Sequence, residues 1–149
     1  MPAICATVST MSHKSGKVAA LTARFAGRGF DARYLGFFDC FNRGQYYEAH
    51  DVLEDLWLLD RQGRDGDFYR GLIQLAGAFV LLQKNRPRGT IALLQLAGQN
   101  LSKYSDHHGS LDVPGLLALI RSRADHLSRS SEQGPDSAPL PAPWINPPE

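Results

Sequence analysis

One stretch of the sequence, from Asp67 to Lys84, is apolar on almost every side when it is wound as a helix. A helix of this kind has no face suited to water, so it is buried in the middle of a domain. We therefore expect this segment to be the central element, with the other helices packed around it. Its large apolar residues are Phe68, Leu72, Ile73, Leu75, Phe79, Val80, Leu81 and Leu82.

Small residues in the same segment predict that another helix approaches it closely. Gly71, Gly77 and Ala78 form a narrow strip around Gln74, the one polar residue in the middle of the segment. The distance between packed helices depends on the size of the side chains at their contact. Gln74 has two interpretations, which both stay open: an amide bonded to a neighbouring helix, or one member of a polar site shared with the preceding helix.

The segment before it, from Tyr46 to Leu59, has the period of an amphipathic helix. Its acidic residues Glu48, Asp51 and Asp55 fall opposite the apolar face, so we expect them to be solvated. Glu48 also lies in the first turn, where the helix dipole favours a negative charge. The apolar face comprises Tyr46, Ala49, Val52, Leu53, Leu56 and Trp57.

His50 and Glu54 lie about one helical turn apart at the edge of that apolar face, next to Trp57, so their side chains can meet. Burying either group without a partner is costly, so we expect them to be bonded. One interpretation is a polar pair that fixes the packing of the helix, and the other is a metal-ligand or general-base pair. The predicted polar site comprises His50, Glu54, Gln74, Trp57 and Glu48.

A metal at this place would need a further protein ligand, because a catalytic zinc is usually held by about three. Glu48 and Asp51 are candidates from the same helix, and His107 or His108 from a later loop. The spacing specifies no particular metal. We assign no catalytic residue and predict no cofactor, since the sequence lacks a nucleophile elbow, a phosphate loop, a Cys-x-x-Cys pair and dinucleotide-binding glycines.

The remaining segments predict an all-α fold. Asp31 is a suitable N-cap for a helix over 32–42, and Gly44 suits the left-handed residue after it, as Asn85 does after the central segment. Further helices are expected over 87–104 and 116–127. Short connections imply antiparallel hairpins, and two hairpins about forty residues apart resemble a tetratricopeptide array. We expect a compact bundle of about five helices arranged as stacked antiparallel hairpins, tetratricopeptide-like.

The two ends of the chain differ from the helical domain, which we place at residues 31–128. Residues 1–30 are expected to be an N-terminal tail with a short helix from Lys17 to Phe25. The absence of acidic residues before Gly29 is also a feature of transit peptides, but we favour the tail. Residues 129–149 form a proline-rich tail, which cannot be helical at its prolines. Within it, Trp144 and Ile145 are apolar, and we expect them to lie back on the domain.

Composition narrows the classes of partner. The 149 residues are 43% hydrophobic and 21% charged, with a formal net charge of +1. This balance makes nucleic acid an improbable partner, although Lys84, Arg86 and Arg88 form a basic turn. No apolar run is long enough for a membrane span, and two distant cysteines suit a reducing compartment, so we expect a cytoplasmic protein. A homo-oligomer is left open.

Two blocks of the sequence resemble a known family. The first runs Phe41-Asn42-x-Gly44-x-Tyr46-Tyr47-Glu48-Ala49-His50-Asp51-x-Leu53-Glu54-x-x-Trp57, and the second is Gly71-Leu72-Ile73-Gln74-Leu75-Ala76, with Asn85 and Gly89 beyond it. Together they resemble the domain of unknown function 309 family from about Tyr34 to Leu101. The resemblance implies a small all-helical protein, mostly bacterial, without an established activity. Pro87 and Thr90 depart from the usual helix-favouring residues of the second hairpin.

Two functions are compatible with these observations. Stacked helical hairpins and an aromatic-rich first hairpin favour a protein- or peptide-binding or structural module, because such hairpins present a groove to a partner. The alternative is a small metal-dependent or hydrolytic enzyme with its site at His50 and Glu54. The sequence names neither a substrate nor a partner.

Overall fold

The computed structural model describes residues 16–133 and 140–149, and within these ranges every regular element is a helix. A helix over residues 16–22 continues into the 3₁₀ turn η1 (Ala23–Phe25). The main helices are α2 (Ala32–Asn42), α3 (Tyr46–Trp57), α4 (Gly66–Gln83), α5 (Pro87–Leu101) and α6 (Val113–Gln133), with the 3₁₀ turn η2 (His108–Ser110) before α6. The predicted all-α class is confirmed.

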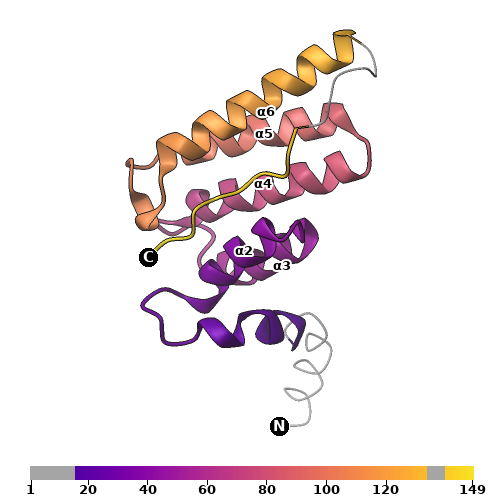
Figure 1. The fold of residues 1–149 in the computed structure, drawn as a ribbon. Coiled ribbons are helices and arrows are strands. Elements are labelled where there is room, and N and C mark those ends of the chain that lie inside the picture. The colour runs from indigo at the N-terminus through magenta and orange to yellow at the C-terminus, as the bar shows by residue number, and fades with distance from the viewer. Residues whose placement is uncertain (1–15, 134–139) are drawn as a thin grey trace.

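Helices that follow one another in sequence pack against one another. α2 contacts α3, α3 contacts α4, α4 contacts α5, and α5 contacts α6. Figure 1 shows the resulting order, in which α4 separates the α2–α3 pair from α5 and α6. The compact bundle is confirmed, whereas its likeness to tetratricopeptide repeats stays a prediction.

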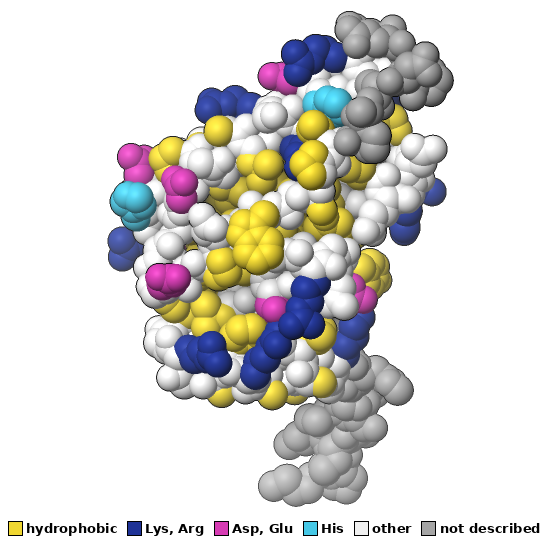
Figure 2. Space-filling model, in the orientation of Figure 1, with side chains coloured by type: hydrophobic (Ala, Val, Ile, Leu, Met, Phe, Trp, Pro, Cys, Tyr) yellow, Lys and Arg dark blue, Asp and Glu magenta, His cyan; other side chains and the backbone are white. Residues whose placement is uncertain are grey.

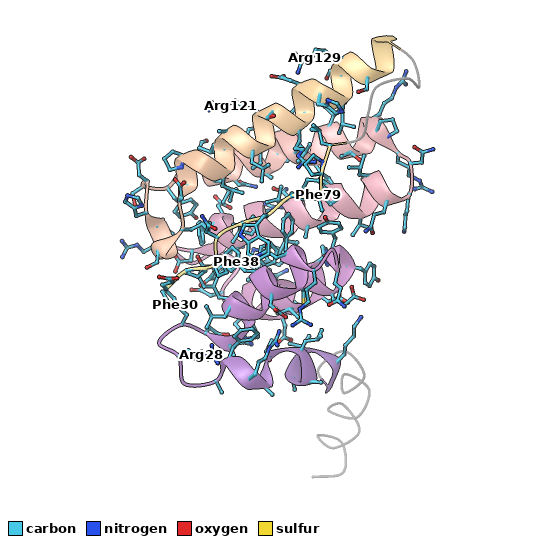
Figure 3. The ribbon with its side chains drawn as sticks, in the orientation of Figure 1. Arg28, Phe30, Phe38, Phe79, Arg121 and Arg129 are labelled. Atoms are coloured by element: carbon cyan, nitrogen blue, oxygen red, sulfur yellow. The ribbon has the colours of Figure 1, made fainter. Side chains whose placement is uncertain are left out.

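α4 is the central helix, as its apolar composition predicts. Phe68, Leu72 and Leu75 are almost completely buried, and an aromatic network joins the helix to α2. The rings of Tyr34 and Phe68 lie 6.1 Å apart between centroids, and those of Phe41 and Phe79 lie 5.6 Å apart. In Figure 3, Phe38 and Phe79 point into the layer between the α2–α3 pair and α4. The core of the domain is therefore this aromatic layer.

The strip of small residues on α4 receives α5. A Cβ added to Gly71 would meet Leu101 Cγ at 2.8 Å, so only glycine allows this approach. Gln74 lies in the same contact, where its Oε1 accepts a hydrogen bond of 2.8 Å from Asn100 of α5. The first interpretation of Gln74, an amide bonded to a neighbouring helix, is the one that the structure shows.

The turns between helices use the residues that the sequence predicts. Gly44 follows α2 with φ +77°, and Asn85 follows α4 with φ +60°. Both values lie in the left-handed region, which glycine and asparagine tolerate better than other residues. Pro87 is at the start of α5, where its missing N–H has no helical partner to lose.

α6 is longer than predicted and contradicts our placement of the last helix at 116–127. It extends from Val113 to Gln133 and so runs past residue 128, where we expected an extended tail. After Pro114 the next proline is Pro135, so no proline interrupts the helix in between. The serines around residue 130 therefore do not end the helix, contrary to our expectation.

Both ends of the described chain pack onto the helical domain. From the N-terminal helix, Val18 and Thr22 are 4% and 6% exposed, and Thr22 lies against Gly36 of α2. Residues 140–149, which we call the C-terminal segment, cross the face of α4 and end beside α2 (Figure 1). Ile145 is 5% exposed, as expected of a residue that lies back on the domain, whereas the neighbouring Trp144 is 63% exposed.

Candidate functional site

The predicted pair on α3 has the expected geometry. His50 Nδ1 lies 3.5 Å from Glu54 Oε2, one helical turn away, and 3.4 Å from Asp51 Oδ1. The side chains of His50 and Glu54 are 34% and 27% exposed, so both are half-buried. Either carboxylate can accept a hydrogen bond from Nδ1 in the tautomer that carries its hydrogen there. A role of this pair in packing, in metal binding or as a general base stays a prediction.

The acidic residues that we expected to be solvated are partly covered. Asp51 is only 14% exposed and therefore more buried than His50. Lys17 of the N-terminal helix approaches Glu48 at 3.8 Å and Asp51 at 3.9 Å. Our expectation for this face is wrong for a simple reason: the helix over residues 16–22 lies near it and places a cation beside the carboxylates.

The other members of the predicted polar site have separate surroundings. Gln74 hydrogen-bonds to Asn100, so the structure joins it to α5 instead of His50 and Glu54. His108, a candidate third ligand, binds Asp65 at the start of α4, with Nε2 and Oδ1 2.7 Å apart. In the part of the chain that the structure describes, no three His, Cys, Asp or Glu side chains are grouped as metal ligands.

Trp57 forms the wall of a polar cleft at the end of α3. The guanidinium carbons of Arg61 and Arg70 lie 5.9 and 6.0 Å from the centre of its ring. Its indole Nε1 is buried and has no hydrogen-bond partner among the described residues. We call this space of about 500 Å³ the arginine cleft. Its lining consists of Trp57, Arg61, Gln62, Gly63, Asp67 and Arg70.

A second space, which we call the apolar cleft, lies between the N-terminal segment, α2 and the C-terminal segment. It measures about 520 Å³ and has aromatic walls, Phe25 and Phe30 on one side and Trp144 on the other. Figure 3 shows Phe30 and Arg28 beside the end of the C-terminal segment. In Figure 2, apolar side chains gather across the middle of this face, with lysine and arginine side chains below them.

Asn42, at the end of α2, attaches the C-terminal segment beside this cleft. Its Nδ2 donates to the carbonyl oxygen of Ile145, and its Oδ1 accepts from the N–H of Ile145, both at 2.8 Å. Arg123 of α6 adds a hydrogen bond of 2.6 Å to the carbonyl oxygen of Pro141. The segment is thus bound through its backbone at two points.

Burial shifts the pKa of one reactive group in this region. Cys40 of α2 is completely buried, and loss of water around its thiol raises its pKa to about 11, with smaller contributions from the charges of Asp39 and Glu48. A thiol with a raised pKa stays protonated near neutral pH and is a poor nucleophile. Cys40 is therefore a core residue.

Residues 34–93 match the family model described as a domain of unknown function (DUF309). The resemblance that the two sequence blocks indicate is confirmed over these residues. The DUF309 match covers α2, α3, α4 and part of α5. It therefore contains His50, Glu54 and Trp57, but not the C-terminal segment.

An uncharacterized protein from Aquifex aeolicus (strain VF5) is similar to this chain. It is 25% identical over 79 residues, which make up 53% of this chain. The chain spans only 24% of the length of that relative. No solved structure matches the chain. In the described ranges, no helix has both the length and the apolar character needed to cross a bilayer.

Our reading of the sequence missed two functional candidates, one inside a DUF309 block and one between the blocks. Asn42 lies inside the first block, but the sequence does not show that its amide meets a segment about a hundred residues later. Arg61 and Arg70 flank Trp57 from a loop and from α4, and the only signal was the density of arginines after Trp57. Both relationships depend on tertiary packing.

Proposed function

We propose that this chain is a peptide-binding module that holds an extended, proline-containing segment of a partner protein along α2. The observation that carries the proposal is the pair of hydrogen bonds between Asn42 and the backbone of Ile145. An amide side chain offers one donor group and one acceptor, which match the N–H and C=O of a single residue. Such a contact recognises an extended backbone whatever its side chains.

The side chains of the C-terminal segment support this mode of recognition. Pro143, Ile145 and Pro148 are buried, while their neighbours Trp144 and Asn146 are exposed. Burial of separated side chains from an extended backbone is a recurrent form of peptide recognition, in which pockets provide the specificity. Prolines favour this form, because they restrict the free peptide to extended conformations and lower the entropy that binding costs.

The chain's own segment leaves room for a better-fitting occupant. The apolar cleft beside it keeps about 520 Å³ between Phe25, Phe30 and Trp144. Arg28 lies in its lining over the ring of Phe25; Glu149 lines the same cleft, but Arg28 forms no ion pair with a described carboxylate. Asp39 is held by Arg24 and Arg43 and so does not neutralise Arg28. We therefore expect a partner segment with a bulky apolar residue next to an acidic one.

A labelled peptide that copies residues 140–149 tests the groove in the full-length chain. The tethered segment competes at a high effective concentration, so the unaltered chain should bind the peptide weakly. Ile145→Asp in the chain weakens this competitor by burying a charge, and fluorescence polarisation should then show about tenfold tighter peptide binding. Adding Asn42→Ala should reverse the gain, whereas Gln95→Ala, an exposed amide on α5, should not.

Two results would contradict the proposal. The first is the absence of saturable peptide binding by the Ile145→Asp chain while its helical circular dichroism is preserved. The second is a concentration-dependent dimer of the unaltered chain that Ile145→Asp abolishes. In that case the groove would exchange segments between copies of the chain, and a separate partner would not be needed. Sedimentation analysis distinguishes these outcomes.

A further inference from the structure

The arginine cleft contains two cations without an anionic partner. Arg61 and Arg70 both stack near the ring of Trp57, and neither guanidinium makes an ion pair or hydrogen bond with any residue that the structure describes. Stacking on an aromatic face positions a guanidinium but does not use its N–H groups. The donors of both side chains are therefore available to a ligand.

Two of the nearby carboxylates have partners outside the cleft. Asp67, which also lines the cleft, binds Lys103 Nζ at 2.9 Å. Asp65, just before α4, binds His108 at 2.7 Å. The cleft thus combines Arg61, Arg70 and the adjacent Lys103 against two carboxylates, that of Asp67 in the lining and that of Asp60 beside Gly63. This leaves a local excess of positive charge in a chain whose formal net charge is only +1.

The size and shape of the cleft restrict the ligand. Its volume of about 500 Å³ lies within the usual range of small-molecule sites and far exceeds that of a bare inorganic ion. Gly63 and Gln62 line the loop side, where the carboxylate of Asp60 lies against Gly63. α4, a helix of 18 residues, begins at Gly66 beside this loop, and the N-terminal end of a helix attracts negative charge.

We propose that the arginine cleft binds a small phosphate-bearing compound. The planar guanidinium groups of Arg61 and Arg70 would bind phosphate oxygens through paired N–H donors, a geometry that phosphate matches well. Trp57 keeps both arginines in place and forms the apolar wall against which the organic part of the ligand packs. This proposal is independent of peptide binding, because the two clefts share no lining residue.

Tryptophan fluorescence can test the proposal, because the chain has only two tryptophans. In a Trp144→Phe background, Trp57 is the sole reporter. Titration with pyrophosphate at constant ionic strength should give a saturable fluorescence change, and a nucleoside triphosphate without metal should bind at least as tightly. Arg61→Gln or Arg70→Gln should weaken binding about tenfold or more, because each removes charge-assisted hydrogen bonds.

Matched variants separate a site from a general charge effect. Arg121→Gln removes an exposed arginine on α6 that does not line the cleft (Figure 3), so it should leave the affinity unchanged. Arg70→Lys keeps the charge but loses the planar fork, and we expect an intermediate affinity. Ile145→Asp, which disturbs the other cleft, should have no effect on pyrophosphate. Each variant should keep the thermal unfolding midpoint of its parent to within a few degrees.

Three outcomes would overturn the inference. One is no saturable change with pyrophosphate at millimolar concentration. Another is an equal loss of affinity in Arg121→Gln and Arg70→Gln, which would indicate diffuse attraction. The last is binding of an oligonucleotide without binding of pyrophosphate or the nucleoside triphosphate, which would make the region a surface for nucleic acid instead of a small-molecule site.

Discussion

The two clefts of this domain each contain one tryptophan, but the surroundings of the two rings are opposite. Trp144 is 63% exposed and lies on an extended segment beside phenylalanines. Trp57 is half-buried at the end of a helix, between two arginines, and its indole N–H has no partner among the described residues. One ring is available to an apolar partner, while the other supports cations.

This difference shows how one core can present two kinds of surface. The apolar cleft is formed by α2 together with the segment before it and the C-terminal segment. The arginine cleft is instead formed by α3, α4 and the loop between them. The DUF309 match at residues 34–93 contains all of the second cleft and only part of the first. Mutations can test whether the two clefts belong to one cooperative unit.

The largest expected effect is on the scaffold beneath both clefts. Phe41 is completely buried, and its ring packs against Tyr46 at 5.1 Å and Phe79 at 5.6 Å between centroids. Phe41→Ala should lower the free energy of unfolding by about 3–5 kcal/mol, because it leaves a cavity in the aromatic layer. Urea denaturation should therefore show a much lower midpoint.

The same experiment asks whether the clefts unfold together. With Trp144→Phe or Trp57→Phe as background, fluorescence reports on one cleft at a time. A cooperative domain should give coincident urea transitions for the two reporters, both shifted equally by Phe41→Ala. Separate midpoints would show that the two clefts belong to independently stable regions.

The fold was predictable wherever local sequence decides the structure. The period of the apolar residues located α2 to α5, and Gly44 and Asn85 marked the turns because only a few residue types tolerate a left-handed backbone. The end of α6 was misjudged, since serine-rich composition was given more weight than the absence of a proline before Pro135. Helix ends depend on weak signals unless a proline or glycine defines them.

The candidate sites were less predictable, because they depend on contacts between distant residues. The spacing of His50 and Glu54 correctly indicated that their side chains meet, since residues one turn apart are neighbours on any helix. No such rule brings Lys17 to Asp51, Asn100 to Gln74 or Asn42 to Ile145. Those contacts follow from how helices and termini pack, which a single sequence does not encode as a short motif.

Alkaline pH should have an intermediate effect on the free energy of unfolding, through the buried thiol of Cys40 on α2. The pKa of the buried Cys40 is raised to about 11, whereas a thiol in an unfolded chain ionises near pH ~8.5. Between these values the unfolded state loses its proton first, so stability should fall as pH rises through this interval, by roughly 1–3 kcal/mol in total. Below pH ~8 the thiol is protonated in both the folded and the unfolded state, so its titration should not lower the stability.

The control for this prediction is Cys40→Ala, which removes the titrating thiol. Its free energy of unfolding, measured by urea denaturation from pH 8 to 11, should decline less steeply than that of the parent chain (these pH limits bracket the ordinary thiol value of ~8.5). Burial also raises the pKa of Tyr34, so some decline should remain at the alkaline end. An identical slope in both chains would show that the thiol is not responsible.

The smallest effect on stability is expected from removing the ion pair between Lys103 and Asp67 at the arginine cleft. Lys103 and Asp67 form an exposed ion pair of 2.9 Å, with side chains 54% and 41% exposed, and Lys103 also donates to Asn100 at 3.3 Å. Exposed pairs contribute about 0–1 kcal/mol, so Lys103→Ala should barely change the free energy of unfolding. It should nevertheless weaken pyrophosphate binding a few-fold, because the carboxylate of Asp67 then faces the anion without its cation.

Asp67→Asn should have the opposite effect, and neither variant should alter peptide binding beside α2. If Lys103→Ala strengthened pyrophosphate binding or weakened the peptide complex, the electrostatic separation of the two clefts would be wrong.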